Sequence, residues 1–414
     1  VIFLVTVIIT FISMKFEQIM PSATTMADAT LPTVAMDTEA GTQYNVLHGY
    51  TLELDSTLFY GNITPVAKDR KLTVTINTYG EDIEGVAYKI RSLEDKSLIE
   101  NTEVSDYDNA GSSINVTFNI KNLLDTGKEY ALEIVLKTKK HEAVYYYTRI
   151  VYGVDYDLQK KLDFVMDFNA CTFDDSRLKD ISGYLETSSS GDNTNYGKVN
   201  INCSLSQVGW GDLDPYVESD IMPEVISVDD DVAILRLSYR VGVANDYSSS
   251  DTYTVSEYYR IRQTNSGFYL LNFEREMNQV FDARNDLTST AKINLGINSS
   301  TDVNCASDEK GIYTYFVNQG SLWCFNSSSQ TFTRVFSFKG EETDSVREGY
   351  DAHNIKIMKI EDNGDATFLV SGYMNRGEHE GQVGVSLCRY SYSDNDVTER
   401  LFIPCLLYTS DAAD

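Results

Sequence analysis

Histidines and carboxylates are the side chains whose types and spacing could do chemistry in this sequence. Two acids flank an imidazole at Glu378-His379-Glu380, and His353 precedes them by a short stretch. Imidazole nitrogens and carboxylate oxygens are common metal ligands, so these residues could bind a metal ion. Acids beside a histidine in a glycine-rich turn are more often a solvated loop, which is the interpretation that we favour. We expect neither a metal ion nor another cofactor.

Two acidic turns are the second candidate for metal chemistry. Asp229–Asp231 and Asp362–Asp365 could hold calcium, because carboxylate oxygens are its preferred ligands. Their spacing does not match an EF-hand, and turn formation alone explains the Asn-Gly pair. The sequence contains no G-x-S-x-G, H-E-x-x-H or P-loop motif, so we expect that the protein is not an enzyme. Its 62 carboxylates leave a glycosidase-like acid pair open, because separation in space decides that question.

The six cysteines are scattered without a C-x-x-C pair, which argues against a zinc site or a redox motif. Four of them lie in alternating, strand-like contexts: Cys203, Cys305, Cys324 and Cys388. We expect these four to be buried free thiols in preference to disulfides.

Aromatic and imidazole side chains in turns are the remaining candidates for ligand contact. Trp210 lies between two glycines, where its ring could either cap a core or line a ligand groove. Tyr145–Tyr147 could form a recognition stripe, but successive strand residues face opposite sides, which favours one core side and one edge. The candidate ligand-surface residues are Trp210, Trp323, Tyr350, His353 and His379.

Composition limits both the fold class and the partners. The chain has 28 Tyr and 18 Phe but 6 Pro, and its turns are rich in Ser, Asn, Asp and Gly, which favours β structure. The formal net charge of -28 repels phosphate backbones, so we expect no nucleic-acid partner.

Residues 44–153 show the alternation of a β-sandwich. Leu72, Val74 and Ile76 alternate with polar residues, which predicts a strand with one buried face. Further along, Leu124 precedes Tyr130 by six residues with a glycine between them, which resembles the tyrosine corner of fibronectin type III domains. The resemblance implies a sandwich in which the Tyr130 hydroxyl bonds back to the connecting loop. The usual proline is replaced by Thr126, and no core tryptophan is present.

Residues 226–404 contain a repeated hairpin pattern after a linker region at 154–225, in which we expect one helix over Asp157–Phe168 and irregular β structure. Each copy begins at a glycine and ends on an aliphatic residue followed by Phe281, Phe336 or Phe402. These phenylalanines recur at intervals of 55 and 66 residues, and the pattern resembles β-propeller domains of exported bacterial proteins. We expect about three blades, which is fewer than the ~4–8 of a closed ring.

The composition of the two ends of the sequence predicts an anchor with a spacer at one end and a non-native segment at the other. Val1–Met14 is apolar, and we expect residues 1–19 to be a 5′-truncated, uncleaved signal anchor in preference to a cleaved signal. Residues 20–43 are small and polar, which is typical of an extended spacer. Residues 405–414 resemble the translation of a sequencing adapter, so we expect the native segment to end near Pro404.

These features predict a mainly β, single-pass protein of the cell membrane with most of its chain outside the cytoplasm. Our first hypothesis is a binding or scaffold protein of the bacterial cell envelope, with a glycan or a surface protein as its partner. The alternative is an exported β-propeller glycan hydrolase with part of its site in further blades. A sensory ectodomain is a third, weaker hypothesis.

Overall fold

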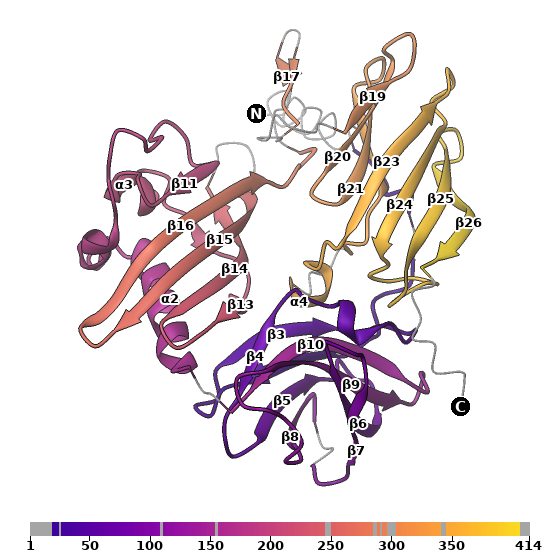
Figure 1. The fold of residues 1–414 in the computed structure, drawn as a ribbon. Helices are drawn as coiled ribbons and strands as arrows, with labels where there is room; N and C mark the ends of the chain where they lie inside the picture. Colours follow the sequence, from indigo (N-terminus) through magenta and orange to yellow (C-terminus); the bar gives the residue numbers. More distant parts are fainter. Residues whose placement is uncertain are drawn as a thin grey trace. The chain divides into compact units, whose positions relative to one another are not determined.

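The protein is mainly β, as predicted, with 49% of the described residues in strands and 9% in helices (Figure 1). The computed structural model describes residues 19–24, 26–107, 111–153, 156–244, 250–284, 288–289, 292–295, 304–340 and 345–405. Contacts divide the chain into two compact units. Unit 1 consists of Val1–Ala29, Gly242–Tyr253 and Asn278–Leu406, and unit 2 of Thr30–Val241, Thr254–Met277 and Leu407–Asp414.

Unit 2 begins with two sheets built from the predicted alternating strands. The first sheet has the order β3-β2-β5-β8: Gln43–His48, Thr33–Asp37, Lys71–Asn77 and Ser113–Asn119. The second has the order β4-β10-β9-β6-β7: Ile63–Val66, Val144–Tyr152, Glu129–Thr138, Ile83–Ser92 and Leu98–Val104. The short 3-10 helix η1 (Ser56–Leu58) lies between β3 and β4 in the sequence.

Aromatic contacts join these two sheets. The Tyr88 ring of β6 stacks on Phe118 of β8 with 4.8 Å between ring centroids, and both side chains are fully buried. At the start of β9, the backbone N–H of Asp125 donates to the Tyr130 hydroxyl at 2.8 Å. The predicted hydrogen bond between this tyrosine and its connecting loop is therefore present.

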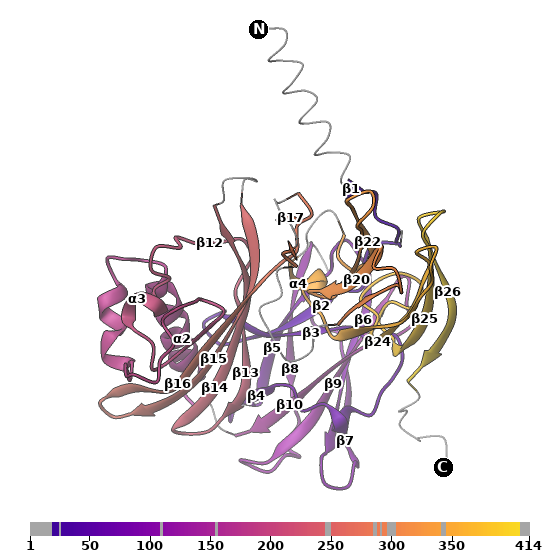
Figure 2. The same cartoon turned by 90° about the horizontal axis from the view of Figure 1, so that it is seen from above.

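A third sheet of unit 2 is covered by a helix. Its order is β11-β16-β15-β14-β12, with β13 also on β14: Lys198–Asn200, Gly267–Gln279, Asp251–Thr264, Val232–Val243, Tyr216–Val217 and Met222–Val228. The helix α2 (Leu158–Thr172) lies along this sheet, and η2 (Leu178–Tyr184) and α3 (Leu205–Val208) follow it in the chain (Figure 2). Phe168 of α2 contacts Tyr259 and Phe273 of the sheet, with centroids 5.7 and 5.4 Å apart.

This third sheet corrects the prediction of a hairpin that begins at Gly267 and ends at Phe281, because Gly267–Gln279 is the single strand β16. The helix over Asp157–Phe168 was predicted and is present, four residues longer at its carboxyl end. The apolar face of α2 packs on β15 and β16, in the part of the chain where the first of about three blades was expected. A face that carries Tyr259 and Phe273 can be covered by a helix or by a sheet, and the alternation of residues in the strands is the same in both cases.

Unit 1 contains two antiparallel meanders. One sheet has the order β1-β22-β21-β20-β19: Ile19–Met20, Thr331–Phe336, Ser321–Asn326, Tyr313–Asn318 and Cys305–Ser307. The other has the order β23-β24-β25-β26: His353–Ile360, Ala366–Tyr373, Val383–Ser391 and Asp396–Pro404. The short hairpin of β17 (Thr288–Ser289) and β18 (Lys292–Ile293) and the one-turn helix α4 (Ser345–Glu348) complete the unit.

The two meanders share one hydrophobic core. The ring centroids of Phe336 in the β19–β22 sheet and Phe368 in the β23–β26 sheet are 5.8 Å apart, and those of Tyr315 and Tyr390 are 6.3 Å apart. On the opposite face of the β19–β22 sheet, Phe281 and its neighbours pack on a second cluster of phenylalanines: Phe316, Phe325 and Phe332. The β19–β22 sheet therefore has a hydrophobic core on each face.

Residues 20–43 differ from the predicted spacer. Residues 21–24 and 26–29, which we call the strap, belong to unit 1: the Ala23 N–H donates to the Arg334 carbonyl oxygen at 3.0 Å. The Arg376 guanidinium donates to the carbonyl oxygens of Ala27 and Met26 at 2.9 and 3.0 Å. Thr33–Asp37 then forms β2. Because most of these bonds involve backbone atoms, side-chain periodicity gave no sign of them.

The remaining expectations concern the ends and the cysteines. No helix among the described residues is long and apolar enough to cross a membrane. Residues 1–18 of the predicted anchor and residues 406–414 of the predicted adapter lie outside the described residues. Cys203, Cys324 and Cys388 are buried thiols, whereas Cys305 is exposed, contrary to prediction.

Candidate functional site

The structure does not gather the five predicted ligand-surface residues into one site. Trp210 belongs to unit 2, and the other four belong to unit 1. Each of the five has a packing or hydrogen-bonding role within its own unit.

Trp210 is part of the core of unit 2. Its side chain is 1% exposed, and its indole N–H donates to Thr172 Oγ1 at 3.3 Å. The Arg275 guanidinium lies over the indole, 3.4 Å from its centroid. Of the two roles considered from the sequence, the indole therefore caps a core and does not line a ligand groove.

A buried polar cluster surrounds this cation. Glu257 and Arg275 are both fully buried, with 3.8 Å between Oε1 and Nη1. The other carboxylate oxygen of Glu257 accepts hydrogen bonds from Asn169 at 2.8 Å and from the Tyr259 hydroxyl at 2.7 Å. Arg275 donates to two backbone carbonyl oxygens, those of Val208 and Gln207. The cluster thus ties α2, α3 and the third sheet together beneath the surface.

The other aromatic candidates pack in unit 1. His379 stacks on Phe402 with ring centroids 3.7 Å apart, and its Nε2 lies 2.9 Å from Glu399. Trp323 is partly buried against Phe281, and Tyr350 meets the edge of Tyr373 with centroids 5.1 Å apart. These contacts position side chains, and none of them brings His379 to His353.

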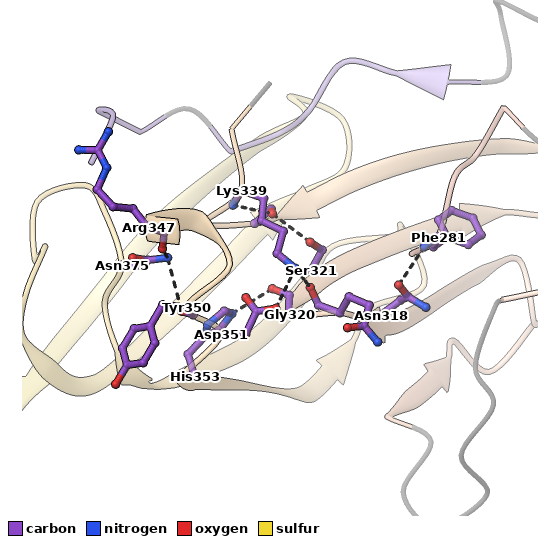
Figure 3. A network of polar contacts seen from close by, with 12 residues as sticks. Phe281, Asn318, Gly320, Ser321, Lys339, Arg347, Tyr350, Asp351, His353 and Asn375 are labelled. Atoms are coloured by element: carbon purple, nitrogen blue, oxygen red, sulfur yellow. Dashed lines mark hydrogen bonds and ion pairs between the residues drawn. The ribbon is translucent and has the colours of Figure 1, made fainter. Parts of the chain in front are cut away.

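His353 belongs to a polar network in unit 1 (Figure 3). Its side chain is buried, and its Nε2–H donates to the Gly320 carbonyl oxygen at 3.0 Å. That bond fixes the tautomer, and Nδ1 has no hydrogen-bond partner among the described residues. Burial lowers the pKa of His353 below its ordinary value, and the bond to Gly320 opposes this only in part. The imidazole is therefore neutral in the folded protein near pH 7.

The rest of the network joins three segments (Figure 3). Lys339 pairs with Asp351 at 2.7 Å and donates to the Gln319 carbonyl oxygen at 2.8 Å. Gly320 has φ +70°, and a Cβ there would lie 2.9 Å from Asp351 Oδ1 and 3.0 Å from His353 Cε1. Only glycine fits this turn without displacing its neighbours. The network therefore depends on the close approach of the Gly320 backbone to the side chains of Asp351 and His353.

The possible metal ligands do not converge. No group of three or more His, Cys, Asp or Glu side chains that could hold a metal ion occurs in the described part of the chain. In the turn at 362–365, Asp365 accepts from the Tyr392 backbone N–H at 3.0 Å and pairs with Arg389 at 3.1 Å. The Asp365 carboxylate therefore links the β23–β24 turn to β25 and the residue that follows it.

A charged triad in unit 2 was not predicted. Lys89 Nζ lies 2.7 Å from Glu53 Oε1 and 2.8 Å from Glu133 Oε1, so two carboxylates share one ammonium group. Glu133 is 1% exposed, and burial raises its carboxyl pKa against the opposing effect of Lys89. Burial disfavours the charged form of Lys89, but the hydrogen bonds to Glu133 and Glu53 outweigh it, so the pKa of Lys89 is raised.

The triad borders an open groove on unit 2. The groove is lined by Thr51, Leu52, Glu53, Lys140, His141, Glu142, Ala143 and Tyr145. Lys89 Nζ lies 5.9 Å from the centroid of the partly buried Tyr145 ring, so the aromatic side chain and the triad adjoin each other. The groove thus presents two carboxylates, one ammonium group, an imidazole and an aromatic ring within one small area.

Sequence reasoning missed this groove because its residues come from separate parts of the chain. Residues 51–53 follow β3, Lys89 lies in β6, Glu133 in β9, and residues 140–145 form the β9–β10 turn and the start of β10. The strand pairing Lys89↔Glu133↔Tyr147 places these side chains on one face of the sheet. The available signal was the presence of charged residues at alternating positions of two strands predicted to be half buried.

No model of a known protein family matches the chain, and no curated protein matches it by sequence.

Proposed function

We propose that this protein is a binding protein of the bacterial cell envelope, held at the membrane by its amino-terminal apolar run, with its ligand site in the groove at Tyr145. The observation that carries the proposal is the Glu53–Lys89–Glu133 triad beside an aromatic ring in an open groove. Preorganised charged groups make strong, directional hydrogen bonds to hydroxyl and amide groups. A glycan of the cell envelope offers such groups together with apolar ring faces that suit a tyrosine.

The proposal includes an architecture for presenting the groove. We assign the first two sheets of unit 2 to a fibronectin III-like β-sandwich, supported by the Tyr130–Asp125 hydrogen bond and the Tyr88–Phe118 stack between the sheets. The two meanders of unit 1 are assigned as propeller-type blades, supported by their strand order and shared core. The apolar sequence Val1–Met14 supports the anchor.

The test is glycan binding by the full chain in detergent, measured on an array of cell-envelope glycans and then by titration calorimetry. Tyr145→Ala and Glu142→Gln are expected to weaken binding of any glycan identified by about tenfold or more, which is about 1.4 kcal/mol. The matched control is Tyr269→Ala, which removes a tyrosine that is 54% exposed outside the groove. Binding that Tyr145→Ala leaves unchanged, or an array without any bound glycan, would refute the proposal.

A second candidate function is glycan hydrolysis, favoured by the two carboxylates of the triad, of which Glu53 lines the groove and Glu133 is buried behind it. Glu133 has a raised carboxyl pKa and shares Lys89 with Glu53, and two carboxylates in different environments are what a general acid and its partner require. Product release from a bound glycan, abolished by Glu133→Gln, would support hydrolysis. Binding without product release would leave the binding function in place.

A further inference from the structure

The two ammonium groups at the groove already have acidic partners. Lys140 lines the groove and pairs with Glu81, whose side chain is 10% exposed. Lys89 lies between Glu53 and Glu133, 2.7 and 2.8 Å from their carboxylate oxygens. Neither ammonium group is therefore left over to neutralise an anionic ligand.

One carboxylate of the groove has no cation beside it. Glu142 is exposed in the β9–β10 turn, and no hydrogen bond or ion pair joins its side chain to another residue in the described part of the chain. With it, four carboxylates lie at the groove against the two ammonium groups. The carboxylates still outnumber the cations when Arg91 is counted, which acts on Glu133 more weakly than Lys89 does.

The excess negative charge surrounds the aromatic ring of the groove. Burial raises the pKa of the Tyr145 hydroxyl, and Lys89 opposes this increase. The carboxylates that raise the pKa further are those of Glu53, Glu133 and Glu142. The electrostatic potential at the ring is therefore negative, which attracts cationic ligands and repels anionic ones.

This charge distinguishes between the glycans that a groove of this kind could bind. Glycans with phosphate or carboxylate groups would be repelled, and N-acetylated amino sugars carry no charge at the nitrogen. A free sugar amine, in contrast, is a cation when protonated and donates charge-assisted hydrogen bonds to carboxylates. An ammonium group near the face of a tyrosine gains a further electrostatic attraction.

We propose that the groove binds a glycan with free amino groups, a de-N-acetylated amino-sugar polymer, whose ammonium groups pair with Glu142 and Glu53. The inference rests on the proposed glycan-binding function and names the substrate class of that site. The Tyr145 ring contacts the apolar face of an adjoining sugar. A neutral or an anionic glycan could not supply the positive charge that Glu142 lacks.

The test compares two probes of equal length and linkage, the β-1,4-linked hexamers of glucosamine and of N-acetylglucosamine. Both are titrated calorimetrically into the full chain in an uncharged detergent at about pH 6.5, below the ordinary pKa of an α-amino group. We expect the glucosamine hexamer to bind about tenfold more tightly or better, which is the effect of one hydrogen bond to a charged group. Its affinity should also fall as the salt concentration rises, because salt screens exposed charges.

Two matched variants test the role of the unpaired carboxylate. Glu142→Gln is expected to remove most of the preference for the glucosamine hexamer, because amide and carboxylate have nearly the same shape but only the carboxylate is charged. The control is Glu186→Gln, which neutralises an exposed carboxylate of unit 2 outside the groove lining. The control should retain the full preference.

The possible outcomes separate this inference from the proposed function. Equal affinity for the two hexamers, lost for both in Tyr145→Ala, would overturn the inference and leave glycan binding by the groove standing. An array without any bound glycan would refute both. Equally tight binding of a lysine hexamer would also overturn the inference, because the groove would then recognise charge alone and would suit a basic peptide.

Discussion

Arg275→Met is the substitution whose effect on stability the structure predicts most directly. Methionine retains much of the length of the side chain but removes the charge that lies beside Glu257 in a fully buried cluster. The Glu257 carboxylate would keep its bonds to Asn169 and Tyr259 and would lose its only nearby cation among the described residues. The carbonyl oxygens of Val208 and Gln207 would lose their donor.

The expected magnitude follows from these losses. Removing one partner of a buried ion pair destabilises a protein by about 3–5 kcal/mol, because the remaining charge stays buried without compensation. At 3.8 Å the pair is longer than a hydrogen bond, which favours the lower end of that range. Loss of the guanidinium–indole contact at 3.4 Å adds about 1 kcal/mol. Arg275→Met should therefore lower the free energy of unfolding of unit 2 by about 4 kcal/mol.

The two tryptophans make the assay specific to one unit. Trp210 lies in unit 2 and Trp323 in unit 1, so in a Trp323→Phe background the fluorescence reports on unit 2 alone. Urea unfolding in that background gives the free energy of unfolding for the parent, for Arg275→Met, for Glu257→Gln and for the double variant. Neutral glutamine can still accept from Asn169 and Tyr259.

The double-mutant cycle tests whether the unpaired charge of Glu257 causes the loss of stability in Arg275→Met. If the buried charge is the cause, Glu257→Gln should recover about 1–3 kcal/mol of the loss caused by Arg275→Met, because no charge is then left unpaired. Purely additive effects would mean that Arg275 acts by packing on Trp210. A loss below about 1 kcal/mol for Arg275→Met would contradict the reasoning as a whole.

Three further predictions concern other parts of the chain. The free energy of unfolding of unit 1, reported by Trp323, should fall as the pH drops from about 7 to about 5, by at most about 1.4 kcal/mol per pH unit. The reason is that unfolding lets the buried neutral His353 take up a proton near its ordinary pKa. His353→Gln should flatten this dependence, and an unchanged slope would show that other groups cause it. Arg376→Ala should lower the stability of unit 1 by about 1–3 kcal/mol and speed amide exchange in the strap, because buried hydrogen bonds to strap carbonyls are lost; unchanged exchange would rule out that role. Tyr130→Phe should cost about 1 kcal/mol in urea unfolding of unit 2, since the Asp125 N–H loses its acceptor, and a neutral result would mean that water replaces the hydroxyl.

The sequence predicted those features that depend on local periodicity. Alternation at Leu72, Val74 and Ile76 identified a half-buried strand, and helical spacing identified α2. The hairpins ending at Phe336 and Phe402 form β21–β22 and β25–β26 as predicted. In each case, side chains a few residues apart share one environment, which a single sequence can reveal.

Features that depend on distant residues could not be predicted. The partner of a strand face is not encoded in the strand, so the helix that covers Tyr259 and Phe273 was replaced in our prediction by a neighbouring blade. Trp210 had two interpretations, and the choice between them depended on Arg275. The groove required Glu53, Lys89 and Glu133 to meet, and no spacing in the sequence indicates that their three segments lie side by side.

The strap has a consequence for the order in which the protein matures during synthesis. Ser22 Oγ accepts a hydrogen bond from Arg334, which lies 312 residues further along the sequence. The Met26 carbonyl oxygen accepts one from Arg376, which lies 350 residues further along. At about 5–20 residues per second, a ribosome needs roughly 15–60 s to make that interval. All of unit 2 through Met277 emerges in the meantime, so it can fold while the strap still waits for its partners. Unit 1 is therefore completed only after unit 2 through Met277 has emerged, although it holds the first described residues, and the strap, without its partners until then, is where a chaperone or a protease would meet the nascent chain.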